Sequence, residues 1–185
     1  MLRTDEFVLR PITAADAERD HAAVMDTREE LRVWEQSAWP EDDFTVEANR
    51  ADLDDLETRH RKHRAFTFTV LDPAEQTALG CVYLFPIDAT FLAKATVTPV
   101  AGERWDDVDV VVYFWLRPAL ADAGADRRLL DALRRWLADE WGFATPVFVT
   151  NEQYERQLRM LRSTDLEMHF ELREPEKAGA YLVFG

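Results

Sequence analysis

Residues 108–141 read VDVVVYFWLRPALADAGADRRLLDALRRWLADEW, and this stretch decides the expected fold. Its first part, Val108–Leu116, is rich in β-branched and aromatic residues and carries one charge, which is typical of a buried strand. After a turn that contains Gly124, apolar residues recur along one helix face, at Leu129, Leu130, Leu133, Trp136, Leu137 and Trp141. The first backbone N–H groups of such a helix have no internal partner, so the turn is suited to an anion.

The composition is that of a globular chain. With 185 residues, of which 47% are hydrophobic and 11% aromatic, the sequence is expected to form one domain over residues 1–185 with a substantial core. Its formal net charge of −14 opposes binding to nucleic acid or to an anionic membrane. The acidity is compatible with a cationic amine partner, and ordinary solvated acidic side chains explain it equally well.

The single cysteine and the amino-terminal residues indicate the cellular compartment in which the protein is expected. Cys81 is the single cysteine, so an intramolecular disulfide is impossible and a reducing compartment is expected. No apolar run is long enough to span a bilayer, and the charged start MLRTDEF is unlike a signal peptide. We therefore expect a cytoplasmic protein. The six tryptophans and a closing strand hairpin leave room for a homodimer.

The other periodic segments complete the expected order of elements. Strands are predicted over residues 7–12, 65–71, 77–86, 146–150, 166–172 and 180–184. Helices are predicted over 13–36 with a break near 26–27, over 45–63 and over 152–162, with Thr13 and Thr45 as N-caps. Residues 88–107 are the least readable segment, with one candidate strand around 95–100. The resulting order, β-α-α-β-β-β-α-β-α-β-β, predicts a mixed α/β fold in which one parallel step interrupts an antiparallel sheet.

Short motifs occur in a characteristic order along nearly the whole chain. They are Leu9-Arg10-Pro11 with Thr13 and Asp16, Trp39-Pro40, Phe44-Thr45 with Glu47, the strand Tyr113–Pro118, and Asn151 directly after a strand. In order and spacing they resemble the GCN5-related N-acetyltransferase (GNAT) superfamily, in particular the branch that acetylates ribosomal-protein amino termini. The resemblance implies the acyl-CoA N-acyltransferase fold, acetyl-coenzyme A as cofactor, and a primary amine acceptor that is either a small molecule or a peptide terminus.

In this family, a signature of Arg or Gln, two residues, Gly, one residue and Gly or Ala holds the cofactor pyrophosphate on backbone N–H groups. Aligned without gaps from Pro118, the signature falls on Ala121, Gly124 and Asp126, and only Gly124 is retained. The resemblance assigns cofactor binding to Phe114, Leu116, Arg117, Ala121, Ala123, Gly124, Ala125, Asp126, Arg127 and Asn151.

Asp122 and Asp126 put pyrophosphate binding in doubt. An aspartate at a helix amino terminus caps the free N–H groups and suits the helix dipole, which is the role that the pyrophosphate would have. Like charges about 4 Å apart also repel by roughly 1 kcal/mol in water, and by several when partly desolvated. Arg127 and Arg128 would offset part of this repulsion if their side chains reach back to the turn.

The catalytic candidates are few. Many relatives protonate the departing thiolate with a tyrosine seven residues after the asparagine, but that position is Leu158 here. Tyr154 lies one turn earlier and is the candidate general acid, with core packing as its alternative role. Asp109 and Tyr113 on the central strand are candidate general bases. A strand carboxylate among apolar neighbours is expected to have a raised pKa, unless it is hydrogen-bonded near the start of the strand.

Three functions follow from these residues. The first is an acetyl-coenzyme-A-dependent N-acetyltransferase that works by direct transfer, with strand N–H groups near Phe114 and Leu116 stabilising the oxyanion. The second is a non-catalytic binding module that keeps the fold but has lost normal cofactor binding. The third is an enzyme with a different acyl donor or binding mode, in which Arg127 and Arg128 hold the phosphates.

Overall fold

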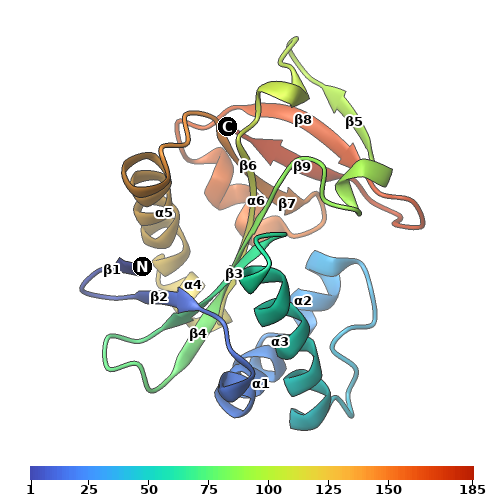
Figure 1. Ribbon diagram of the computed structural model, residues 1–185. Coiled ribbons are helices and arrows are strands. Elements are labelled where there is room, and N and C mark those ends of the chain that lie inside the picture. Colours follow the sequence, from blue (N-terminus) through green and yellow to red (C-terminus); the bar gives the residue numbers. More distant parts are fainter.

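The β-branched and aromatic segments form nine strands. They are β1 (Leu2–Arg3), β2 (Val8–Pro11), β3 (Phe66–Leu71), β4 (Ala78–Phe85), β5 (Thr96–Pro99), β6 (Val110–Leu116), β7 (Pro146–Asn151), β8 (Met168–Arg173) and β9 (Tyr181–Phe184). The computed structural model describes residues 1–185 and joins these strands into one sheet, in the order β1-β2-β3-β4-β6-β7-β9-β8-β5 (Figure 1).

The helical segments lie between these strands. The α-helices are α1 (Ala17–Asp26), α2 (Arg28–Glu35), α3 (Val46–Arg61), α4 (Pro118–Asp122), α5 (Ala125–Trp141) and α6 (Glu155–Arg162). Three short 3₁₀ helices are η1 (Ala14–Asp16), η2 (Leu92–Lys94) and η3 (Trp105–Asp107). None of the helices has the length and apolar composition that crossing a bilayer requires.

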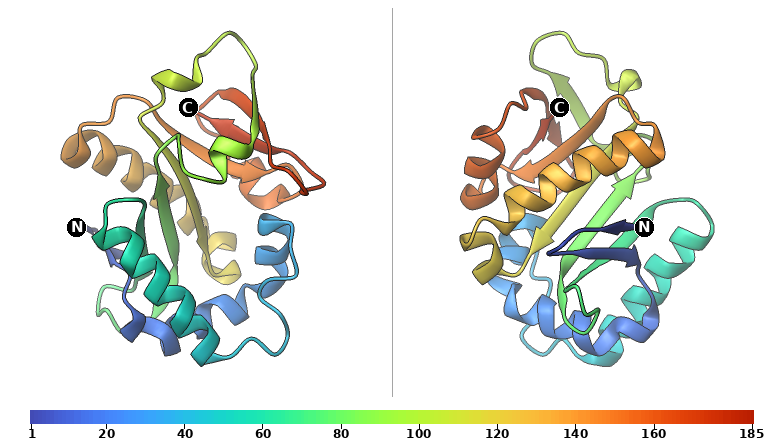
Figure 2. Two further views of the ribbon diagram at one scale, coloured as in Figure 1. Left: turned by 45° about the vertical axis from the view of Figure 1, so that its right-hand side comes forward. Right: turned by 90° about the vertical axis from the view of Figure 1, so that its left-hand side faces the viewer.

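The central strand β6 divides the core into two layers. Its seven residues are all buried, because helices cover both faces of the sheet. The even-numbered residues of β6 pack with α5 and α6, and the odd-numbered residues pack with α1, α2 and α3. In the right-hand view of Figure 2, α5 lies across the near face of the sheet. The apolar face of α5 includes four fully buried leucines, each contributing about 1.5–3 kcal/mol by burial: Leu129, Leu130, Leu133 and Leu137.

The predicted mixed sheet is confirmed, including its single parallel step. The β6–β7 pair is parallel, and every other neighbouring pair in the sheet is antiparallel. The predicted closing hairpin is the β8–β9 pair, which stands beside β7 through β9. The predicted helix break is also present, because α1 ends at Asp26 and α2 begins at Arg28.

Three segments differ from the expectation, the first being the short strand β1, which was not predicted. The turn before the central helix contains an extra short helix, α4, because Pro118 occupies its first position, where a missing N–H costs nothing. The helix expected from residue 152 begins only at Glu155. The side chain of Asn151 accepts a hydrogen bond from the backbone N–H of Gln153 at 2.8 Å, which holds residues 151–153 in a turn before the helix.

Candidate functional site

The parallel strands β6 and β7 separate towards their carboxyl ends. Their pairing begins at Val110–Pro146 and ends at Val112–Phe148, although both strands continue beyond that pair. We call the space between their unpaired ends the strand gap. The side chain of Gln157 reaches into it from α6, and its Nε2 donates a hydrogen bond to the carbonyl oxygen of Phe114 at 2.8 Å. The N–H of Phe114 points to the same side as its carbonyl, so this strand edge offers both a donor and an acceptor.

The amino terminus of α5 lies after the carboxyl end of β6. Gly124 precedes the helix with a φ of 76°, a left-handed conformation that favours glycine. The carboxylate of Asp126 accepts a hydrogen bond from the backbone N–H of Arg127 at 2.8 Å, so it caps the helix as the sequence predicts. Burial raises the pKa of Asp126, and the backbone hydrogen bond opposes that shift only in part.

The two arginines that follow Asp126 point in different directions. Arg128 reaches back to the turn, where it donates to the carbonyl oxygen of Ala123 at 3.2 Å, and it also pairs with Glu6 at 2.8 Å. Arg127 turns away from the helix terminus and pairs with Asp131 at 3.3 Å. Of the two arginines, Arg128 therefore meets the condition that its side chain reach back to the turn, and Arg127 does not.

A third arginine directly precedes Gln157 in the chain. Arg156 on α6 donates to the carbonyl oxygen of Pro118 at 2.9 Å and lies 3.5 Å from a carboxylate oxygen of Asp122. The same guanidinium pairs with Glu30 of α2 and donates to the hydroxyl of Tyr154 at 2.7 Å. The Tyr154 hydroxyl in turn donates to Glu30 at 2.7 Å. We call these four side chains the Arg156 cluster; it joins α2, α4 and the start of α6.

The sequence placed Tyr154 within the helix predicted over residues 152–162. In the structure Tyr154 is instead the amino-terminal cap residue of α6. Burial and the hydrogen bond to Glu30 raise the pKa of its hydroxyl, although the Arg156 guanidinium acts in the opposite direction. Tyr154 therefore keeps its proton at neutral pH, as a general acid must before it acts.

Of the two interpretations of Asp109 that the sequence allowed, the raised pKa of a general base is wrong. Hydrogen bonds from the backbone N–H groups of Thr145, at 2.8 Å, and Ala144, at 2.7 Å, lower the pKa of this carboxylate. Asp109 also lies just before β6 begins, at the opposite end of the strand from Leu116. A hydrogen-bonded carboxylate near the start of the strand was the other interpretation, and this is what the structure has.

Two of the residues assigned to cofactor binding make contacts within the chain. Arg117 donates to the carbonyl oxygen of Ala78 at 2.8 Å and pairs with Asp26 at 3.3 Å. Asn151 is fully buried, and its amide nitrogen donates to the carbonyl oxygen of Val33 at 2.7 Å, which ties the end of β7 to α2. The small residues Ala121 and Ala125 are buried beside Gly124 and flank the left-handed turn.

On the face of the sheet covered by α1, α2 and α3, the structure has a cavity of about 450 Å³. We call it the aromatic cavity. Its lining comes from α2, α3, β4, β6, β9 and three loops: Trp34, Glu35, Trp39, Asp52, Asp55, Leu56, Arg59, Tyr83, Phe85, Phe91, Tyr113, Glu174, Lys177 and Tyr181. Of the candidate catalytic and cofactor-binding residues only Tyr113 lines it, and Trp39 of the Trp39-Pro40 motif lines it as well. The others escaped notice because they lie far apart along the chain and share no motif.

Three carboxylates of the aromatic cavity are less acidic than usual. Burial raises the pKa of Glu35, of Glu174 and of Asp52, and Lys177 lowers the pKa of the first two only in part. Burial also raises the pKa of Tyr113 well above its usual range, so its hydroxyl is neutral at pH 7 and cannot act as a base there.

The fold has many solved counterparts. No protein-family model matches the chain, and no curated protein matches its sequence. A ribosomal-protein-S5-alanine acetyltransferase from Vibrio fischeri superposes with a TM-score of 0.67 at 18% identity, covering 98% of this chain and 93% of that one. RimL, a ribosomal L7/L12 alpha-N-protein acetyltransferase in complex with coenzyme A, gives 0.70 at 12% identity, with coverages of 98% and 93%.

A third counterpart differs in its described role. The microcin C7 self-immunity acetyltransferase MccE, in complex with acetyl-CoA and AMP, has a TM-score of 0.68 at 10% identity and covers 98% of this chain and 92% of its own. All three are acetyltransferases, and they share the whole architecture with this chain. The protein therefore has the GNAT acyltransferase fold, which confirms the resemblance drawn from its sequence at the level of fold.

The strand gap offers unused polar groups to a cofactor of the acetyl-CoA type. Gln157 is buried and its Oε1 has no hydrogen-bond partner; Nε of Arg156 is likewise buried without one. A side chain added at Gly124 would meet only the flexible Arg128 guanidinium, at 3.4 Å, so the approach to the helix terminus is open. The unpartnered oxygen of Gln157 suits an amide N–H of such a cofactor, whereas Asp126 already binds the N–H of Arg127, one of the free donors at the amino terminus of α5.

Proposed function

We propose that this protein is an acetyl-coenzyme-A-dependent N-acetyltransferase that moves an acetyl group to a primary amine by direct transfer. The observation that carries the proposal is the shared wall of the two spaces described above. Tyr113 lines the aromatic cavity, and the next residue, Phe114, presents its backbone to the strand gap. Two substrates held on the two sides of β6 suit a direct transfer, because proximity alone removes much of the barrier to a reaction of two molecules.

The chain supplies groups for each part of such a reaction. Acetyl-coenzyme A, when bound, supplies an acetyl group activated as a thioester. The backbone N–H groups of Phe114 and Leu116 are the proposed donors to a developing oxyanion. Tyr154 is hydrogen-bonded to Arg156, the residue proposed below for the phosphates, so the departing thiolate at the other end of the cofactor takes its proton from solvent. Glu35, with its raised pKa, is the proposed acceptor of the ammonium proton.

Arg156 is the cation that we propose for the cofactor phosphates. The family signature begins with Arg or Gln where this chain has Ala121, so the usual side chain is missing from that position. Arg156 lies near the same loop through its hydrogen bond to the Pro118 carbonyl. A planar guanidinium binds phosphate oxygens in a bidentate manner, which makes it a suitable replacement.

The test is a thiol-release assay with acetyl-coenzyme A and a panel of primary amines. Transfer is expected with some of these amines. We expect Glu35→Gln to lower kcat/KM by about 10²-fold, a usual contribution of general base catalysis. Glu167→Gln, an exposed residue outside both spaces, is the control. Release of thiol at the uncatalysed rate with every amine would refute the proposal.

One observation favours a second function, a non-catalytic binding module. Asp126 already caps the helix terminus that would bind pyrophosphate. If this cap abolishes cofactor binding, calorimetric titration with acetyl-coenzyme A will give no heat, and the melting temperature will not change. The double variant Asp122→Gly/Asp126→Gly should then gain an affinity that the parent lacks. Micromolar binding by the parent would exclude this alternative.

A further inference from the structure

The wall of the aromatic cavity is a continuous surface of rings. Tyr113 is at its centre, with ring centroids 6.0 Å from Trp34, 5.8 Å from Phe85 and 6.4 Å from Tyr181. Phe91 packs edge-to-face on Phe85 at 4.9 Å. The faces of such rings attract organic cations and apolar groups alike. The wall therefore suits a ligand with an apolar body and a positive charge.

The charges in the cavity favour a cation over an anion. Four carboxylates and two basic side chains line it. Arg59 is paired with Asp55 at 2.5 Å, so its charge is already neutralised. Lys177 donates through Nζ to the backbone carbonyl of Glu35 at 2.5 Å. The carboxylates of Glu35 and Glu174 make no hydrogen bond or close ion pair within the chain, and they remain available to a ligand.

Two buried donors on the same wall have no partner. The indole Nε1 of Trp34 and the hydroxyl of Tyr113 are both buried, and neither makes a hydrogen bond. Both side chains are more than nine-tenths buried, with 6% and 5% of their surfaces exposed, and both line the cavity. A buried donor without a partner costs about 1–3 kcal/mol, which an acceptor on a ligand would recover.

We infer that the aromatic cavity binds a small primary amine whose ammonium group is carried on an apolar body together with a hydrogen-bond acceptor such as a carbonyl. Glu35 and Glu174 would receive the ammonium, the rings would cover the apolar body, and Trp34 and Tyr113 would donate to the acceptor. A cavity of about 450 Å³ is of the size that encloses one small organic molecule. The acetylation of this amine rests on the proposed function, but its binding does not.

Binding is tested by calorimetry without any cofactor, using four probes of matched size. They are phenylalaninamide, with charge, ring and carbonyl; phenethylamine, without the carbonyl; 2-phenylethanol, without the charge; and phenylacetate, with the opposite charge. Phenylalaninamide should bind most tightly. Phenethylamine should bind about 3- to 10-fold more weakly, the value of one hydrogen bond. 2-Phenylethanol should bind at least about tenfold more weakly than phenethylamine, and phenylacetate should give no heat of binding.

Single variants connect these differences with particular side chains. Tyr113→Phe keeps the ring and removes the unpartnered hydroxyl, so it should reduce the advantage of phenylalaninamide over phenethylamine. Glu174→Gln should weaken both amines about tenfold and leave 2-phenylethanol unchanged. Glu167→Gln removes one charge from an exposed position outside the cavity and should change none of the affinities.

The outcomes separate this inference from the proposed transferase. Binding of phenylalaninamide with the expected order of affinities, but without acetyl transfer, would support the cavity assignment and count against the enzyme. Acetyl transfer to phenylalaninamide and phenethylamine that Glu174→Gln leaves unchanged would overturn the cavity assignment and leave the enzyme intact. Binding confined to peptides of several residues would also overturn it, because the occupant would then be a protein terminus.

Discussion

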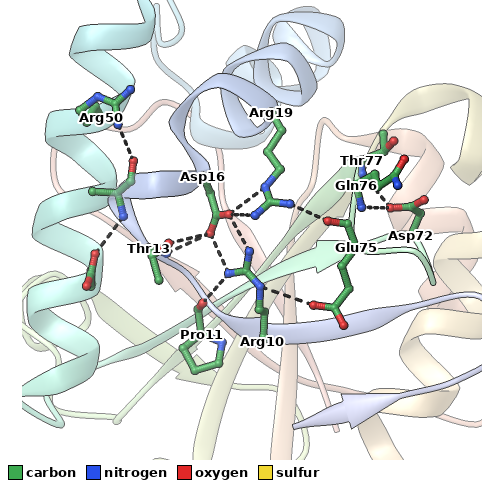
Figure 3. A network of polar contacts seen from close by, with 12 residues as sticks. Arg10, Pro11, Thr13, Asp16, Arg19, Arg50, Asp72, Glu75, Gln76 and Thr77 are labelled. Carbon is green, nitrogen blue, oxygen red and sulfur yellow. Dashed lines mark hydrogen bonds and ion pairs between the residues drawn. The ribbon is translucent and has the colours of Figure 1, made fainter.

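The carboxylate of Asp16 accepts two hydrogen bonds from the guanidinium of Arg10, at 2.9 and 2.7 Å, although Asp16 is completely buried (Figure 3). The backbone N–H and the hydroxyl of Thr13 and the side chain of Arg19 donate to the same carboxylate. Burial by itself would raise the pKa of Asp16, but the hydrogen bonds from Arg10 and Arg19 outweigh burial and lower it. The motif at residues 9–16 thus ties β2 to the start of the first helix.

The first prediction concerns this network. Asp16→Ala should lower the free energy of unfolding by about 2–4 kcal/mol, because it leaves partly buried guanidinium groups without their acceptor. Urea denaturation at pH 7 measures the loss. Asp165→Ala is the matched control, since it breaks an exposed pair with Arg134 that should matter far less. Equal losses in the two variants would show that the buried network has no special role.

The same network predicts a loss of stability in acid. A carboxylate with a lowered pKa in the folded state contributes stability that is present above its unfolded-state pKa, near 3.8 for Asp16, and lost as pH falls through the lowered value. In Asp16→Ala, this part of the acid destabilisation should disappear.

Asp20 gives a prediction of the opposite sign. Burial raises its pKa from 3.8 to about 6, although Asn49 donates a hydrogen bond to it at 2.9 Å. Between these values the folded state binds the proton more tightly than the unfolded state, so stability falls as pH rises from about 4 to about 6. Asp20→Asn removes the buried charge and should stabilise the protein at pH 7.5 by about 1–3 kcal/mol, and much less at pH 4. Thermal unfolding at the two pH values compares the variants. An equal shift at both would contradict a titrating Asp20.

Gly80 on β4 should tolerate no side chain. A Cβ at this position would lie 2.0 Å from the carbonyl oxygen of Trp115 on the neighbouring strand β6, so the backbones would have to move apart. Gly80→Ala should therefore destabilise the protein by about 3 kcal/mol or more, as a severe steric clash does. Gly142→Ala is the comparison: nothing lies within 4 Å there, and only its φ of 70° is unfavourable, at a cost of about 1 kcal/mol. Similar losses in the two variants would contradict the close approach of β4 and β6.

The elements that the sequence predicted are those with a strong local signal. The continuous apolar run of β6 and the helical spacing in α5 identify the centre of the fold. Thr45 was predicted as an N-cap, and its hydroxyl accepts a hydrogen bond from the N–H of Ala48 at 3.1 Å. The strand β5 gave only a weak signal, because three of its four residues are exposed and its partner β8 lies some seventy residues further along the chain. A strand with so few buried residues lacks the alternation of apolar and polar residues by which strands are predicted.

The site was harder to predict than the fold, because its chemistry depends on contacts between distant residues. Asp109 has apolar sequence neighbours, but the two N–H groups that lower its pKa belong to residues 144 and 145. Trp34 and Glu174 meet in one cavity although no motif joins them. The cap formed by Asp126, in contrast, was visible in the sequence, since a helix cap is a local structure and Asp126 forms it with the next residue.

The last prediction concerns that cap. Asp126→Asn keeps an oxygen that can accept the hydrogen bond of the Arg127 N–H, but it removes the negative charge facing a bound pyrophosphate. Removing a like charge that is partly desolvated is worth about 1 kcal/mol or more, so acetyl-coenzyme A should bind roughly 5- to 10-fold more tightly. Calorimetric titration measures this change.

Glu30→Gln provides an independent test of cofactor binding. Glu30 holds Arg156 in an ion pair, and its neutral replacement should free the guanidinium for the phosphates and also raise the affinity. Asp165→Asn, which removes a charge from the exposed pair with Arg134, should leave the affinity unchanged. If Asp126→Asn and Glu30→Gln bind the cofactor no better than Asp165→Asn, electrostatic repulsion and the closed Arg156 cluster do not limit binding. The pyrophosphate would then have to be held away from the amino terminus of α5.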